Sequence, residues 1–215
     1  MAGPARRRAP STLESRSPER LVHCSLSIKA WSTQTPSVEA VRPARCPACG
    51  AASHPVGAGL TLHGHGLRER QVRGVRAPFE PPSLLTILAR RYACLRCSAI
   101  LLVVPAAVAP RRLFDLATLA FALARWCADG VASRAVRAEV SPLPFDGDSA
   151  RRAWSQLRRW ARRAAEILRP PRTFAADASV TSTLGVLGAV AALAPLSVAA
   201  RPLAERAFAA MATAW

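Results

Sequence analysis

Two pairs of cysteines with the same spacing are the clearest chemical feature of this sequence. Each pair is separated by two residues, and the four positions are Cys46, Cys49, Cys94 and Cys97. A Cys-x-x-Cys turn directs both sulfurs to one point and lets backbone N–H groups donate to the thiolates. Gly50 and Ser98 follow the pairs, and small residues there allow a tight turn. The sequence therefore predicts one structural Zn²⁺ per chain, held by four thiolates.

The two pairs lie farther apart in the chain than in compact zinc ribbons. The usual separation is roughly 15–20 residues, and the segment between Cys49 and Cys94 is longer. We therefore expect an inserted hairpin that brings the two turns together.

Other interpretations of the cysteines and histidines are weaker. Disulfide frameworks belong to secreted chains, and thioredoxin-type sites use a single Cys-x-x-Cys at the start of a helix. Four cysteines close a tetrahedral site and leave no open position for a catalytic water. We therefore interpret His54, His63 and His65 as turn or surface residues, and Cys24 and Cys127 as ordinary thiols.

An arginine-rich segment, residues 151–168, is the second chemical feature. On a helical wheel its apolar residues form one continuous arc: Ala153, Trp154, Leu157, Trp160, Ala161, Ala164, Ile167 and Leu168. The polar residues form the opposite arc: Arg151, Arg152, Ser155, Gln156, Arg158, Arg159, Arg162, Arg163 and Glu166. Like charges at this spacing repel each other, so the face favours contact with DNA phosphates. A solvated face or an acidic protein partner is the alternative.

The charge of the whole chain agrees with a polyanionic partner. Thirty basic residues face 13 acidic ones, giving a formal charge of +17, and Lys29 is the only lysine. A GC-rich coding bias would explain arginine in place of lysine, but it would not explain the imbalance between bases and acids. Composition therefore favours nucleic acid over an anionic membrane surface or simple solvation of the charges.

The elements that must position these residues indicate an α+β chain in four parts. Residues 1–42 are polar and lack periodicity, which predicts a disordered basic arm. Residues 43–108 contain short extended runs (60–63, 70–75, 83–92 and 99–104), which predict a small antiparallel zinc ribbon. Residues 109–172 are predicted to be helical, and residues 173–215 form an alanine-rich helical tail.

Three helices in the third part fit a helix-turn-helix-like arrangement. They are expected at Leu113–Ala128, ended by Gly130, at Ala132–Val140, and from an N-cap at Asp148 or Ser149 to Pro171. In such modules the last helix enters the major groove. Its first half would then contact bases or phosphates through Arg151, Arg152, Ser155, Gln156 and Arg159. The second turn is longer than in the compact form.

Targeting signals are weak. The N-terminus is basic but has no apolar run behind it, so it is not a secretory signal. Ala178–Ala200 carries no charge and is long enough to span a bilayer, but Gly, Pro, Ser and Ala gain little from insertion. We expect a buried or loosely ordered helical region there, in a cytoplasmic, nucleoid-associated protein of undetermined oligomeric state.

The stretch CPACG…HGHGLRERQVRG…RRYACLRCSAILLVVP resembles the N-terminal zinc ribbon of bacterial insertion-sequence transposases. It is still more similar to a group of uncharacterised bacterial proteins related to that ribbon. The resemblance covers residues 45–104 and implies zinc on the four cysteines. It also implies a nucleic-acid-facing surface that contains Arg68, Arg70, Arg73, Arg90 and Arg91.

The resemblance does not extend to the catalytic part of those transposases. Their RNase-H-like domain needs three carboxylates, and after Arg172 this sequence has only Asp177 and Glu205. No nucleophile–base pair or open metal site is visible either, so we expect a protein that is not an enzyme. The sequence favours a zinc-dependent DNA-binding protein derived from, or associated with, a transposase. The alternative is an adaptor whose ribbon and arginine helix bind an acidic protein, such as a transposase subunit.

Overall fold

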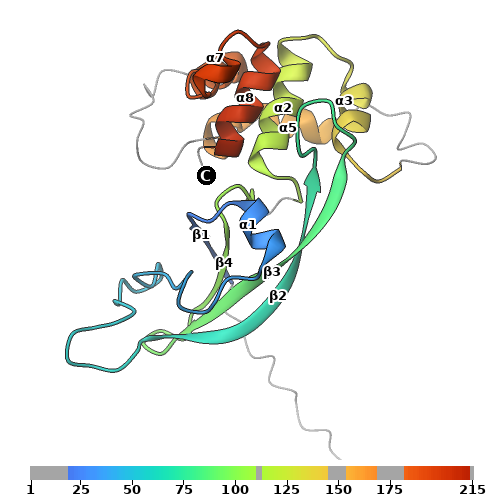
Figure 1. The fold of residues 1–215 in the computed structure, drawn as a ribbon. Coiled ribbons are helices and arrows are strands. Elements are labelled where there is room, and N and C mark those ends of the chain that lie inside the picture. Colours follow the sequence, from blue (N-terminus) through green and yellow to red (C-terminus); the bar gives the residue numbers. More distant parts are fainter. Residues whose placement is uncertain (1–18, 110–112, 145–153, 169–181, 214–215) are drawn as a thin grey trace, which may run out of the picture.

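A computed structural model describes residues 19–109, 113–144, 154–168 and 182–213, and these form an α+β structure (Figure 1). The strands are β1 (Arg20–Cys24), β2 (Leu62–Gly74), β3 (Ser83–Cys94) and β4 (Ile100–Pro105). The α-helices are α1 (Ile28–Thr33), α2 (Leu116–Cys127), α3 (Ser133–Val140), α5 (Ser155–Arg162), α6 (Ala164–Ile167), α7 (Thr183–Ala191) and α8 (Leu203–Thr213). A short 3₁₀ helix, η1, spans Leu196–Val198.

The four strands form one sheet in the order β1-β4-β3-β2. Long antiparallel strands β2 and β3 make a curved hairpin that extends from the cysteine turns to the helices (Figure 1). The predicted antiparallel strands are confirmed, but the runs 60–63 and 70–75 belong to the same region of extended chain. Residues 64–69 continue the strand between them, with an irregularity between Gly64 and Leu67.

Residues 19–42, predicted to be part of a disordered arm, form ordered structure instead. Strand β1 pairs in parallel with β4, with Val22 opposite Val103. Trp31 of α1 is 2% exposed, and its Nε1 donates to the carbonyl of Leu88 at 2.9 Å. Local periodicity does not reveal this segment because it is stabilised by partners far away in the sequence. Residues 1–18 lie outside the described part.

Helix α2 is the centre of the helical domain, as its apolar sequence predicts. Residues 116–124 are all buried. The helix begins at its N-cap Asp115, whose Oδ1 accepts a hydrogen bond from the Thr118 backbone N–H at 2.7 Å. It ends before Gly130, which has a φ of +69° and lets the chain turn away. The predicted second helix is confirmed as α3.

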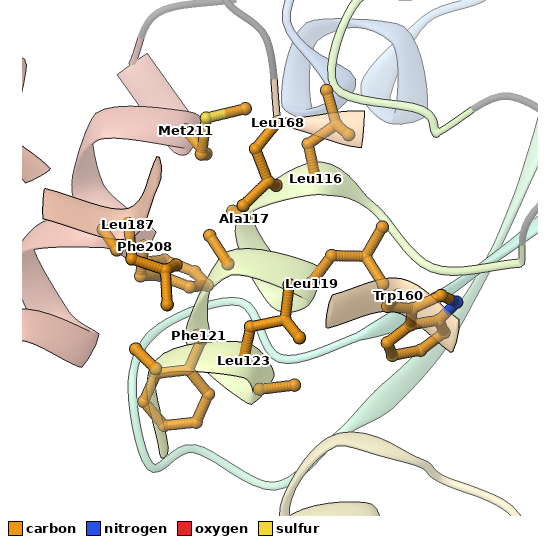
Figure 2. Packing of buried hydrophobic residues seen from close by; sticks show 14 of the residues in the cluster. Leu116, Ala117, Leu119, Phe121, Leu123, Trp160, Leu168, Leu187, Phe208 and Met211 are labelled. Carbon is orange, nitrogen blue, oxygen red and sulfur yellow. The ribbon is translucent and has the colours of Figure 1, made fainter. Parts of the chain in front are cut away.

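In the alanine-rich C-terminal region, the described residues 182–213 form helices as predicted, and they are part of the same core. Helices α7 and α8 pack against α2, where Phe208 is buried beside Phe121 and Leu187, and Met211 lies near Leu168 in the same core (Figure 2). Small alanine side chains let these helices approach closely, while a few large residues supply most of the buried apolar area. No helix in the described ranges is both long and apolar enough to cross a membrane.

The turn of the β2–β3 hairpin joins the sheet to the helical domain. The backbone N–H of Val75 donates to Thr118 Oγ1 at 3.2 Å, and Phe79 meets the ring of Phe121 edge-on at 5.4 Å. Arg125 of α2 lies over the Phe79 ring and also pairs with Glu139 of α3. These contacts fix the far end of the sheet against α2.

Candidate metal centre and basic groove

The four cysteines meet at one point, as their spacing predicts. All four sulfurs lie within 4.8 Å of one another. Two of the separations, Cys46 Sγ to Cys97 Sγ and Cys49 Sγ to Cys94 Sγ, are 3.8 Å. A tetrahedral ion with Zn–S bonds of about 2.3 Å places its sulfurs about 3.8 Å apart. The cluster therefore fits a metal ion of this kind.

The two cysteine turns share one backbone pattern. In the first, the Cys46 N–H donates to the Ala51 carbonyl and the Gly50 N–H to the Cys46 carbonyl, both at 2.8 Å. In the second, the Cys94 N–H donates to the Ala99 carbonyl at 3.0 Å and the Ser98 N–H to the Cys94 carbonyl at 2.8 Å. Each turn thus forms the same two backbone hydrogen bonds, and its two sulfurs lie beside those of the other turn.

The long insert between the turns is an extended hairpin, as expected. Leu62 at the start of β2 lies opposite Cys94 at the end of β3. The Leu95 N–H donates to the Thr61 carbonyl, and the Thr61 N–H donates to the Ser53 carbonyl. Because Ser53 follows the first cysteine turn and Leu95 belongs to the second, these two hydrogen bonds through Thr61 join the two turns. Cys46 and Cys94 are buried against the sheet, whereas Cys49 and Cys97 are exposed.

The cluster resists ionisation of all its thiols at once. Burial opposes the thiolate of Cys94, but the backbone N–H groups of Cys97 and Arg96 stabilise it and lower its pKa to about 7. The backbone N–H of Ala99 favours the Cys97 thiolate, but partial desolvation and hydrogen bonds with the other three sulfurs outweigh it and raise the pKa of Cys97 to about 12. A divalent cation would provide the missing positive charge and deprotonate the remaining thiols.

The arginine-rich segment has the two faces that the helical wheel predicts. The apolar face is buried through Trp154, Leu157, Trp160, Ala164, Ile167 and Leu168, with Ala161 partly buried. The polar residues Ser155, Gln156, Arg158, Arg159, Arg162, Arg163 and Glu166 are exposed. The helix is interrupted at Arg163, and α6 follows as a separate turn. Arg151, Arg152 and Ala153 lie outside the described residues, as do Asp148 and Ser149.

An aromatic cluster anchors the arginine helix to the rest of the structure. The Trp160 ring meets Phe114 at 5.2 Å and Trp154 at 4.9 Å, both edge-on. The backbone of Phe114 forms an isolated parallel β-bridge with Arg73 of β2. Phe114 also directly precedes Asp115, the N-cap of α2. The position of α5 relative to the sheet is therefore fixed by buried rings. The helical wheel predicts the tryptophan face, but no local pattern indicates that Phe114 completes it.

The five arginines predicted on the ribbon do not form one surface. Directly paired residues in antiparallel strands share a face, and Arg68 lies opposite Ala89. Arg68, Arg70 and Arg91 therefore lie on one face of the hairpin. Arg73 and Arg90 belong to the other face, where Arg90 Nε donates to the Pro36 carbonyl at 2.7 Å. Resemblance alone could not separate them, because the faces depend on strand register.

A groove lies between the first of these faces and helix α5. It has a volume of about 1260 Å³. Its charged lining consists of Arg20, Arg68, Arg70, Arg159, Arg162, Arg163, Glu19 and Glu69. The lining therefore has six arginines and two glutamates. In this groove, arginines that were predicted on the ribbon lie near arginines that were predicted on the helix. No sequence pattern indicates Glu19 and Arg20 as groove residues, because they lie in a polar segment without periodicity.

The arginines in and beside the groove differ in their partners. Arg70 is half-buried, and its Nη2 donates to the Ala109 carbonyl at 3.1 Å. Burial, and then the neighbouring Arg68, lower its pKa. Arg163 pairs with Glu166 at 2.7 Å. Among the described residues, Arg158, Arg159 and Arg162 have no carboxylate within ion-pair distance. These three guanidinium groups therefore stay available for an external anion.

Comparisons with known proteins add no relative to this picture. No family model, no curated protein and no solved structure matches the chain. The resemblance to transposase ribbons therefore stays a prediction from the quoted residues. The helix-turn-helix interpretation also stays a prediction, because residues 145–153, between α3 and α5, lie outside the described part.

Proposed function

We propose that this chain is a zinc-dependent DNA-binding protein that contacts phosphates through the groove between the sheet and α5. The observation that carries the proposal is the convergence of two independent basic groups on one groove. Arg68 and Arg70 come from β2, whereas Arg159 and Arg162 come from a helix nearly one hundred residues later. Arginines from unrelated elements repel one another unless an anion lies between them.

The size of the groove favours a polymer over a small metabolite. Pockets for small molecules usually enclose about 300–1,000 Å³, and this groove is larger. Its lining is rich in guanidinium groups, whose planar forks bind phosphates well. A duplex lying across the groove would place phosphates near both rims, so binding would be dominated by charge.

Zinc has a structural role in this proposal. Arg91 lies three residues before Cys94 on β3, and the second cysteine turn ends that strand. A Cys₄ centre would hold the ends of β2 and β3 together and thereby fix the face that carries Arg68 and Arg91. A tetrahedral site closed by four thiolates supplies no bound water for chemistry. The proposed protein is therefore a binding module, not an enzyme, and would act with or regulate a transposase.

A titration with duplex DNA at several salt concentrations tests the proposal. Each phosphate contact contributes a slope of about −0.9 in a plot of log affinity against log salt. We expect Arg159→Ala and Arg162→Ala each to weaken binding to a labelled random duplex and to reduce the slope by about one contact. Zinc content and thermal unfolding of each variant establish that the fold is intact.

Arg158 provides a matched control on the same helix. Its side chain is exposed and lacks a carboxylate partner among the described residues, like that of Arg159, but it does not line the groove. The proposal requires Arg158→Ala to have clearly less effect than Arg159→Ala. Equal effects would indicate general attraction by net charge. No shift of duplex DNA at physiological salt would instead favour the adaptor, whose arginines would meet an acidic protein.

A further inference from the structure

We infer that Arg68 and Arg91 form a discrete phosphate-binding site, and that the carboxylate of Glu19 occupies it as an internal, displaceable competitor. This inference rests on the proposed function and makes it more specific. It identifies one contact point within the groove and a residue of the chain that opposes binding there.

The geometry is that of one anion shared by two guanidinium groups. Oε2 of Glu19 pairs with Nη1 of Arg68, and Oε1 of Glu19 accepts from Nε of Arg91 at 3.1 Å. The two arginines come from neighbouring strands and share a face of the hairpin. A phosphodiester group also offers two unesterified oxygens to two donors, so it would satisfy the same pair.

The site is open on the side of the groove. The Arg68 side chain is 60% exposed, although it already has an ion-pair partner. Arg68 and Glu19 both line the groove. An external phosphate can therefore approach Arg68 without passing through the core. The Glu19 side chain is 21% exposed, and a carboxylate in a partly exposed ion pair is held less firmly than one that is buried with its partner.

Glu19 occupies this site because of where β1 begins. It directly precedes Arg20, and β1 continues in parallel with β4 at the sheet edge. The pairing of β1 holds the Glu19 backbone close to the two arginines, while its side chain can rotate away. Binding of a phosphate would exchange one anion for another, so Glu19 would reduce affinity without blocking the groove.

Glu69 provides a control for the effect of net charge. It also lines the groove, yet no arginine among the described residues pairs with it. Glu19→Gln and Glu69→Gln each remove one negative charge from the groove lining. Glu69 lies opposite Leu88, on the other face of the hairpin from Arg68 and Arg91, so only the first variant frees the arginine pair. Any difference between the two variants therefore reports the site itself.

The experiment is a titration of a labelled random DNA duplex with both variants and the wild-type chain between about 50 and 200 mM salt. At low salt we expect Glu19→Gln to bind about two- to fivefold more tightly than the wild type, the range expected for an ion pair that solvent still reaches. The salt slope should steepen by about 0.9, because one more phosphate contact forms. Glu69→Gln should change the affinity less and leave the slope unchanged.

A double-mutant cycle decides between the site and a general effect. In a chain that carries Arg68→Ala and Arg91→Ala, the Glu19→Gln change should no longer increase affinity. If the increase persists there, or if Glu69→Gln matches it, the inference is overturned.

Inorganic pyrophosphate separates failure of this inference from failure of the proposed function. In NMR spectra of the arginine Nε–H groups, pyrophosphate should shift the Arg68 and Arg91 resonances of the wild type, and more so those of Glu19→Gln. If duplex DNA does not bind but these shifts occur, the proposed function fails and the anion site stands. If pyrophosphate shifts neither resonance in the wild type, the site is refuted whether or not Glu19→Gln folds.

Discussion

Gly50 and Ser98 occupy equivalent positions in the two cysteine turns, each four residues after the first cysteine of its pair. Both have a positive φ, +73° for Gly50 and +57° for Ser98. Glycine adopts this conformation freely, whereas serine is strained there because of its Cβ. The two turns therefore have the same geometry but differ in conformational cost.

Exchanging the residues at these positions should have opposite effects on stability. Ser98→Gly relieves the strained φ and should raise the free energy of unfolding by up to about 1 kcal/mol. The gain is reduced because glycine also increases the conformational entropy of the unfolded chain. Gly50→Ser should lower it by about 1 kcal/mol, and no atom lies near enough to a Cβ at Gly50 to add a steric term. Urea denaturation of zinc-loaded protein measures both changes. Ser98→Ala, which keeps the Cβ, should show no gain.

Removal of zinc should affect the sheet more than the helices. Cys46 and Cys94 belong to the buried cluster of the sheet, which is separate from the cluster around α2. We expect one zinc per chain, lost in Cys94→Ser and retained in the matched variants Cys24→Ser and Cys127→Ser. Hydrogen exchange should then speed up along β2 and β3, while α2 and α8 stay protected. Equal loss of protection in both regions would show that the chain unfolds as one unit.

Acid should release the metal through competition by protons. Four thiolates must be deprotonated to bind zinc, and the pKa of the Cys94 thiol is lowered to about 7. Zinc affinity should therefore fall as the pH drops below 7, because a thiolate that takes up a proton no longer coordinates the ion. A chromophoric chelator titrated between pH 7.5 and 5 measures this, and an affinity independent of pH would exclude thiolate ligation.

The junction between hairpin and helices should depend on the absence of a side chain at Gly74. This glycine has a φ of +147°, and a Cβ there would clash with the Thr118 side chain. Gly74→Ala should cost about 2–3 kcal/mol of stability by overpacking and backbone strain. Adding Thr118→Ala should recover part of the loss, although it also removes the hydrogen bond from Val75. Gly59→Ala, where a Cβ would meet no atom, is the control.

Local sequence patterns predict the elements of this structure better than their assembly. The spacing of Cys46, Cys49, Cys94 and Cys97 predicts the metal centre because each turn is a local motif. The faces of α5 follow from its 3.6-residue period. The groove depends instead on the register of β2 with β3 and on Phe114, and no short-range pattern encodes either. The order of residues 19–42 likewise depends on contacts with distant strands.

Trp160 should couple the stability of the helical domain to the shape of the groove. It is buried between Phe114 and Trp154, and it also lies at the groove lining. Trp160→Ala should cost about 3–5 kcal/mol by creating a cavity, and the milder Trp160→Phe should keep the fold. If α5 must be held in this position for its arginines to contact DNA, Trp160→Phe should weaken duplex binding at a temperature where the protein is fully folded. Trp126 is a partly buried residue beside the same core, and Trp126→Phe should lower stability similarly but leave duplex affinity unchanged. Equal losses of affinity in both variants would show that the groove is not where the duplex binds.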